Sequence, residues 1–283
     1  MADTDDAPAP LGGEYFFLRA NLEFTLFHEL SHMLIDELEL PVLGREEDAA
    51  DRIAVVAMLL ARQEQPPAKV IPWLFAVAGD WYTEWEWGGE TNVPRYADPH
   101  PLEIQRFHNV VCLVFGSNPD LLDGLIDTTL LPFERAMTCE REYRLARRAV
   151  QWVRDSYGHQ GARDKAGATA GKIRVSYMAA NPDNRPVYDW LLRSRLADDI
   201  AEFVATRIAL PHDIRIEFDN CPRDPDALWR ADLRRVGICY ELLQHFLTVG
   251  RYRIANHQRA CALPVLRQFV GDALQCDAAV EAD

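Results

Sequence analysis

Apolar residues recur at helical spacing in the first part of the chain. Between Asn21 and Leu40 they return every three or four positions, forming a stripe of Leu22, Leu26, Leu30, Met33 and Ile35. Pro41 is expected to end this helix, because a proline disfavours the α-helical conformation in the residue before it. The acidic segment 46–48 then opens a second helix that runs to about Arg62, since the helix dipole favours negative charge in the first turn.

Further helical patterns follow, separated by prolines and glycines. A third helix begins after Pro66 and carries a tryptophan stripe, expected to face the core, with acidic residues such as Asp80 on its wet side. A polar loop covers residues 87–101. Beyond it the pattern predicts helices at 102–115, 119–127 and 133–157.

The pattern changes to alternation in the later part of the chain. Segments 172–178, 213–218 and 236–240 place apolar residues at every second position, which is typical of strands with one buried face. Helices are expected at 186–207, 241–248 and 258–274. Segment 158–171, GHQGARDKAGATAG, has no apolar periodicity and is interpreted as a linker.

These patterns predict an α+β fold that is mostly helical, with one small sheet packed beside the first helix. Residues 1–157 form a helical region, and residues 172–283 form a strand-bearing region that completes the same globular domain. Three strands are about the minimum for a stable sheet, so the three segments are expected to pair with one another.

Composition and charge narrow the class of protein. The 283 residues are 48% hydrophobic and 26% charged, the balance of an ordinary globular protein. The net charge of −14 argues against nucleic acid as a partner, because phosphate binding needs a local excess of positive charge. No apolar run reaches the roughly 18–20 residues of a membrane span, so no membrane partner is expected. The first ten residues, MADTDDAPAP, lack the features of a signal peptide, which favours a cytoplasmic location.

The six cysteines leave the compartment open. No two of them form a CxxC pair, which excludes a cysteine-only zinc knuckle. Cys112 with Cys139 and Cys221 with Cys239 join neighbouring predicted elements, and either disulfides or free thiols fit them. If the disulfides form, the protein works in a secreted or periplasmic setting.

The segment FHELSH, residues 27–32, carries the clearest chemistry. His28 and His32 are four residues apart, which turns a helix by about 400°, so both imidazoles lie on one face and can hold one metal ion. Glu29 is placed to act as the general base for a zinc-activated water. The alternative is a surface helix whose histidines are merely polar.

The second helix supplies the remaining candidates. A catalytic zinc takes three protein ligands, and Glu47, which lies 15 residues after His32 across a turn, is the expected third ligand. Asp51 follows Glu47 on the same face and is expected to orient a histidine through its other ring nitrogen. Glu46 and Asp48 are interpreted as helix-start residues.

HELSH followed by EDAAD resembles the gluzincin metallopeptidase pattern, HExxH and then ExxxD. The resemblance implies a zincin-like fold with His28, His32 and Glu47 as zinc ligands, Glu29 as the base and Asp51 as their support. The longer stretch FTLFHELSHMLIDELELPVLGREEDAADRIA resembles an uncharacterised bacterial family classed as metallopeptidases, which shares LPVLGREEDAAD. DPHPLEIQRFHNVVCLVFGSNPD, CEREY, KIRVSYMAA, LPHDIRIEFDNC and ICYELLQHF resemble the same family.

Two features depart from that family. Ser31 stands where the family usually has glycine, and the helix should tolerate this small residue. The strand-bearing segment follows the HExxH helix, whereas in the family it precedes it, so the chain resembles a circular permutation. Such an arrangement is tolerated where the joined ends are exposed and close together.

Peptide hydrolysis also needs a donor for the developing oxyanion. His100, in the polar loop, is preferred over Tyr96, Arg106, His108 and Tyr240, and a simple loop or capping role for His100 remains open. The leading prediction is a zinc metallopeptidase acting on peptide or protein substrates. The alternatives are a zinc-binding sensor or partner-binding module without proteolysis, and a structural helical protein with an accidental motif.

Overall fold

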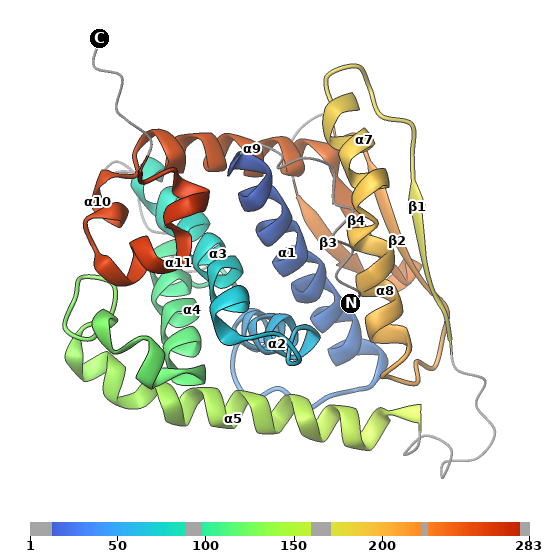
Figure 1. Cartoon of the computed structure of the whole chain (residues 1–283). Helices are drawn as coiled ribbons and strands as arrows, with labels where there is room; N and C mark the ends of the chain where they lie inside the picture. Colours follow the sequence, from blue (N-terminus) through green and yellow to red (C-terminus); the bar gives the residue numbers. More distant parts are fainter. Residues whose placement is uncertain (1–12, 89–97, 160–170, 222–225, 278–283) are drawn as a thin grey trace. The chain divides into compact units, whose positions relative to one another are not determined.

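The computed structural model describes residues 13–88, 98–159, 171–221 and 226–277 (Figure 1). The chain forms two compact units. We call Leu22–Arg62 with Leu145–His245 the sheet unit, and Ala2–Asn21 with Gln63–Arg144 and Phe246–Asp283 the helical unit. Each unit combines segments from before and after residues 158–171. The expected organisation of a helical region, a linker and a strand-bearing region within one domain stays a prediction.

Helices α1 (Gly13–Glu37) and α2 (Glu46–Ala61) follow the predicted apolar pattern. Leu22, Leu26, Leu30 and Met33 are fully buried. α1 ends in a Schellman motif that precedes Pro41 in the chain. The N–H of Leu40 donates to the carbonyl of Ile35, and Glu39 takes a left-handed conformation with φ of 49°. The turn therefore depends on Glu39 as much as on the proline.

A buried ion pair joins α1 to the end of α2 inside the sheet unit. Both terminal nitrogens of the Arg62 guanidinium donate to the two carboxylate oxygens of Glu23. The Glu23 side chain has no exposed surface, and that of Arg62 is 5% exposed. The two charges are thus removed from water and depend on each other for compensation.

The sheet unit contains a four-stranded sheet in the order β1-β2-β4-β3. The predicted strands correspond to β1 (Ile173–Tyr177), β2 (Ile214–Asp219) and β4 (Arg235–Cys239), which pair in parallel. β3 (Ala227–Arg230), which the sequence did not reveal, pairs antiparallel with β4 at the edge. Parallel neighbours need a crossover, and α7 (Arg185–Ser194) with α8 (Leu196–Ala205) supplies it between β1 and β2 (Figure 1).

The sheet packs beside α1, as predicted. Glu37 of α1 accepts hydrogen bonds from His212 Nδ1 at 2.6 Å and from Arg234 Nε at 3.0 Å. Trp229 Nε1 donates to Asp36 at 3.3 Å. The α+β prediction is confirmed: helices dominate, and one small sheet lies against the helix that carries His28.

Three predicted helices are divided in the structure. The segment 186–207 breaks at Arg195, which is left-handed with φ of 51°, to give α7 and α8. The segment 119–127 forms two short 3-10 turns, η1 (Pro119–Leu121) and η2 (Asp123–Leu125). The segment 258–274 divides into α10 (Gln258–Cys261) and α11 (Pro264–Leu274), because Pro264 forces Leu263 into an extended conformation.

The helical unit packs α3 (Pro67–Gly88) against α4 (Glu103–Ser117). The expected tryptophan core is wrong in part: Trp85 is 45% exposed, while Asp80, assigned to the wet side, is buried. The apolar residues that α3 buries are Val70, Ile71, Leu74, Phe75, Ala76, Val77 and Ala78. α9 (Tyr240–Ala255) extends well beyond its predicted end at 248.

Three disulfides cross-link the described residues. Cys112–Cys139 joins α4 to α5 (Phe133–Tyr157), and Cys221–Cys239 encloses β3 in its loop. Both are pairings that the sequence left open against free thiols. Cys261–Cys276, which was not predicted, spans α10 and α11. Among the described residues no helix is long and apolar enough to cross a membrane.

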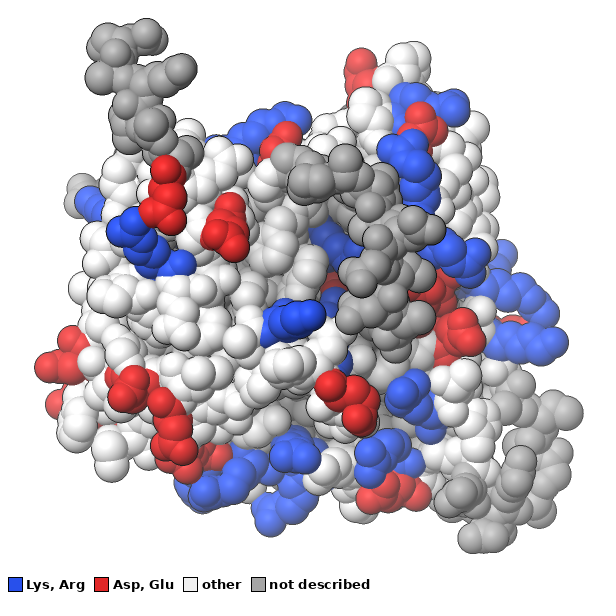
Figure 2. Space-filling view, viewed as in Figure 1, with Lys and Arg blue, Asp and Glu red and all other residues white. Residues whose placement is uncertain are grey.

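Charge is unevenly distributed along the chain. α5 carries six arginines against four acidic residues, in a protein whose net charge is −14. Basic side chains gather over this helix along the lower edge of the face shown in Figure 2. The acidic excess therefore lies elsewhere in the sequence.

Replacing Arg62 with methionine should lower the free energy of unfolding by about 3–5 kcal/mol, because the variant leaves the Glu23 carboxylate buried without its charge partner. The double variant Glu23→Leu/Arg62→Met should lose less, since it removes both charges. Urea unfolding followed by circular dichroism measures both. A single variant within about 0.5 kcal/mol of wild type would contradict the pair's importance.

Candidate metal centre

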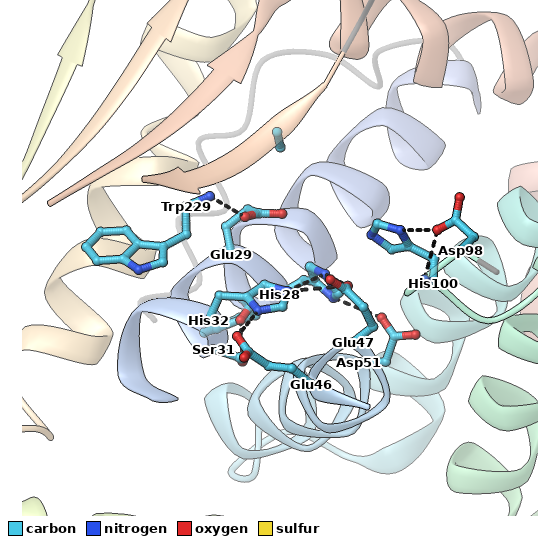
Figure 3. Close-up of polar contacts among 12 residues, drawn as sticks. His28, Glu29, Ser31, His32, Glu46, Glu47, Asp51, Asp98, His100 and Trp229 are labelled. Carbon is cyan, nitrogen blue, oxygen red and sulfur yellow. Dashed lines mark hydrogen bonds and ion pairs between the residues drawn. The ribbon is translucent and has the colours of Figure 1, made fainter. Parts of the chain in front are cut away.

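The candidate site lies entirely in the sheet unit, where side chains of α1 face side chains of α2. His28 and His32 project from successive turns of α1, and Glu47 and Asp51 project from successive turns of α2 (Figure 3). Because both pairs have four-residue spacing, the two helices place them opposite each other. The four side chains that the sequence singled out thus lie in contact, and their roles as ligands and support stay a prediction.

Three donor atoms converge between the helices. His28 Nε2 and His32 Nε2 are 3.1 Å apart, and Glu47 Oε2 lies 3.2 Å from the first and 3.4 Å from the second. A tetrahedral ion with bonds of about 2.0–2.2 Å to nitrogen and oxygen holds its ligand atoms about 3.3–3.6 Å apart. The three atoms form a triangle close to one face of such a tetrahedron, so this set fits a small divalent cation.

Outer carboxylates hold the other nitrogen of each imidazole. Asp51 Oδ1 lies 2.9 Å from His28 Nδ1, and Glu46 Oε1 is hydrogen-bonded to His32 Nδ1 at 2.7 Å. A proton on each Nδ1 leaves both Nε2 lone pairs facing Glu47, which is the tautomer that metal binding requires. Asp51 occupies the position expected from the sequence. Glu46 contacts His32 as well, although the sequence suggested only a helix-start role for it.

The charge balance of the site also favours a cation. Burial lowers the pKa of His32, but hydrogen bonds to Glu47 and Glu46 and the charges of Glu47 and Glu29 outweigh it and raise the pKa to about 9. The imidazolium is favoured because several carboxylates surround the two rings. The excess negative charge of these carboxylates is stabilised by positive charge placed between them, which protons or a divalent ion can supply.

Glu29 points from α1 toward the sheet. Its Oε2 accepts a 2.7 Å hydrogen bond from the backbone N–H of Trp229 in β3 (Figure 3). Burial raises the pKa of Glu29, while the charges of His28 and His32 and the Trp229 N–H act in the opposite direction. The sequence pattern does not reveal the contact with Trp229, because β3 is only four residues long and Trp229 lies 200 residues after Glu29.

Ser31 fits the site helix without distortion. Its side chain is buried, and its hydroxyl donates to the carbonyl of Phe27 at 2.6 Å. The Ser31 hydroxyl thus finds its hydrogen-bond acceptor within α1. The helix continues through this position, as expected for a small residue.

The expected oxyanion donors are otherwise engaged. His100 belongs to the helical unit, and its Nδ1 and backbone N–H both bond to Asp98 Oδ1 at 2.9 Å (Figure 3). Arg106 stacks 3.6 Å from the Trp81 ring centroid, His108 bonds to the carbonyl of Leu130, and Tyr240 donates to that of Met178. Tyr96 lies outside the described residues. The His100 contacts are those of a loop residue, and its catalytic role stays a prediction.

His28, His32 and Glu47 can together hold a divalent metal ion, and the buried carboxylate of Glu29 lies on the same helix as the two histidines. Residues 17–154 and 177–268 match the protein family whose description reads "Putative metallopeptidase". The match covers most of the chain, which belongs to this family. No curated protein and no solved structure matches the chain.

The wild-type chain should bind one zinc ion, and the neighbouring residues Glu46 and Glu47 should differ in their effect on it. Glu47→Gln removes a charged donor atom and should weaken zinc binding more than Glu46→Gln, which removes a supporting contact and should cost about 10–100-fold. Competition with a chromophoric chelator measures the affinities. Asp48→Asn is the matched control and should bind as wild type does. A larger loss from Glu46→Gln would reverse the assignment.

Proposed function

We propose that this protein is a zinc metallopeptidase that hydrolyses peptide bonds in peptide or protein substrates. The observation that carries the proposal is the triangle of His28 Nε2, His32 Nε2 and Glu47 Oε2, with sides of 3.1–3.4 Å and with carboxylates against both outer nitrogens. Membership of the family described above supports the same activity. The zincin-like character of the fold and the gluzincin ligand set belong to this proposal.

Zinc held by His28, His32 and Glu47 would polarise the scissile carbonyl and lower the pKa of a water molecule. Glu29 takes the proton of that water as general base and later delivers it to the leaving amine. Trp229 N–H bonds to Oε2, so Oε1, which lacks this contact, is the oxygen assigned to receive the proton. The contact from Trp229 fixes the carboxylate, so that it need not reorganise during the reaction.

One observation favours the alternative, a zinc-binding sensor or partner-binding module without proteolysis. His28 and Glu29 are each only 6% exposed, and β3 contacts Glu29 directly. In this structure a peptide would therefore have little access to the Glu29 carboxylate. Loss or retention of turnover on changing Glu29 separates the two functions.

Glu29→Gln should keep zinc and the fold but lose turnover by about 10²–10⁴-fold, because the amide cannot accept the proton of the water. The measurement is cleavage of a broad peptide mixture near neutral pH, with zinc content determined on the same samples. Asp36→Asn is a control on the same helix; it alters a contact to the Trp229 side chain and should keep most activity. Cleavage that survives in Glu29→Gln would place the active site elsewhere. Zinc binding without cleavage in wild type would favour the sensor or module.

The three disulfides lead us to propose an oxidising compartment, secreted or periplasmic, in place of the cytoplasmic location first expected. Protein isolated from its native host should resist alkylation until it is reduced and then gain six alkyl groups, since six cysteines are present. Mass spectrometry provides the count. Full alkylation without reduction would restore the cytoplasmic expectation.

The permuted segment order stays a prediction that alignment with relatives would test.

A further inference from the structure

The helical unit contains a cavity of about 380 Å³ that plays no part in the metal centre. Residues of α3 and α4 supply part of its wall, and residues of α10 and α11 supply another part. Tyr252 and Arg253, from the last turn of α9, also line it. The volume lies within the range of about 300–1,000 Å³ that is usual for small-molecule sites.

Most of the deep lining is apolar. The large buried side chains on the cavity wall include Phe75, Phe107, Val111, Leu266 and Val270. They come from α3, α4 and α11. These surfaces would favour an apolar body over a polar one, because burying apolar area removes it from water.

Arg253 introduces a charge into this apolar setting. Its side chain is 15% exposed, and its Nη1 lies 3.8 Å from Glu86 Oε2, beyond hydrogen-bond range. Its Cζ is 5.7 Å from the centroid of the Tyr82 ring. Among the residues that the structure describes, none forms a hydrogen bond with this guanidinium. By contrast, the buried Arg62 is held by two carboxylate oxygens of Glu23.

Such a group is costly to bury without hydrogen-bond partners. Burial lowers the pKa of Arg253, and the charge of Glu86 opposes that shift. A guanidinium has five N–H donors in a planar fork that matches a carboxylate. A ligand carboxylate could therefore make the hydrogen bonds that Glu86, at 3.8 Å, does not make to this guanidinium.

The surroundings of Arg253 match this ligand chemistry. The charged residues on the cavity wall are Arg253, Arg259 and Glu86, an excess of one positive charge. Asn256 and Gln258 add neutral hydrogen-bonding groups. The α10–α11 wall is closed by Cys261–Cys276, which limits its freedom before a ligand arrives.

We propose that this cavity binds a small amphipathic monocarboxylate, with the apolar body against the buried wall and the carboxylate on Arg253. A cavity of 150 Å³ accommodates benzene, so this volume suits a ligand of about 12–15 non-hydrogen atoms. A single negative charge suits the excess of one positive charge on the cavity wall. Binding in this cavity requires neither peptidase activity nor zinc.

Decanoate is a suitable probe, with decan-1-ol as its neutral counterpart, and calorimetric titration of the full chain measures both. Wild type should bind one decanoate. Arg253→Gln should weaken decanoate binding about tenfold or more while changing decanol binding little, because only the charged hydrogen bonds are lost. Arg251→Gln is the matched control: this residue lies on the same helix, is 62% exposed, and does not line the cavity. It should bind decanoate as wild type does.

A second variant keeps the test decisive if Arg253→Gln does not fold. Leu263→Trp enlarges a half-buried side chain on the cavity wall and should weaken decanoate and decanol alike. His32→Ala should leave decanoate binding unchanged, which separates this site from the metal centre. Absence of saturable decanoate binding in folded wild type would overturn the proposal. So would equal affinity in wild type, Arg253→Gln and Leu263→Trp.

Discussion

The packing of α2 against α1 is the constraint on which the site depends. With four-residue spacing on both helices, His28 meets Asp51 and Glu47, while His32 meets Glu46 and Glu47. Displacing one helix along the other by a turn would break every one of these contacts. The Glu23–Arg62 ion pair fixes the opposite end of the same hairpin, because neither buried charge can slide away from the other. Electrostatics therefore sets the register at both ends, and apolar burial supplies most of the adhesion between them.

The sheet contributes to the site through its edge strand. β3 is only four residues long, yet its backbone at Trp229 provides the hydrogen bond to Glu29. The disulfide Cys221–Cys239 closes the chain segment that contains β3, which limits how far this strand can move. The contact that would position the base also restricts access to it.

Much of this architecture could be predicted from local sequence pattern. The apolar spacing in α1 and α2 predicts two amphipathic helices, and the alternation in β1, β2 and β4 predicts three strands. The breaks within predicted helices were harder to see, since Arg195 adopts a left-handed conformation that its residue type does not favour. The buried position of Asp80 and the partial exposure of Trp85 show the same limit, because neighbouring helices decide which face of α3 is covered.

The sequence by itself determined the candidate ligands. Histidines four apart on a helix share a face whatever surrounds them, and a carboxylate pair with the same spacing must do likewise. Only the tertiary structure decided the partners of Glu46 and Glu29, the third disulfide and the role of β3. Each of these depends on which segments distant along the chain come within a few ångströms of one another. Spacing along one helix is fixed by covalent geometry, whereas a contact such as Trp229 with Glu29 depends on the packing of the whole unit.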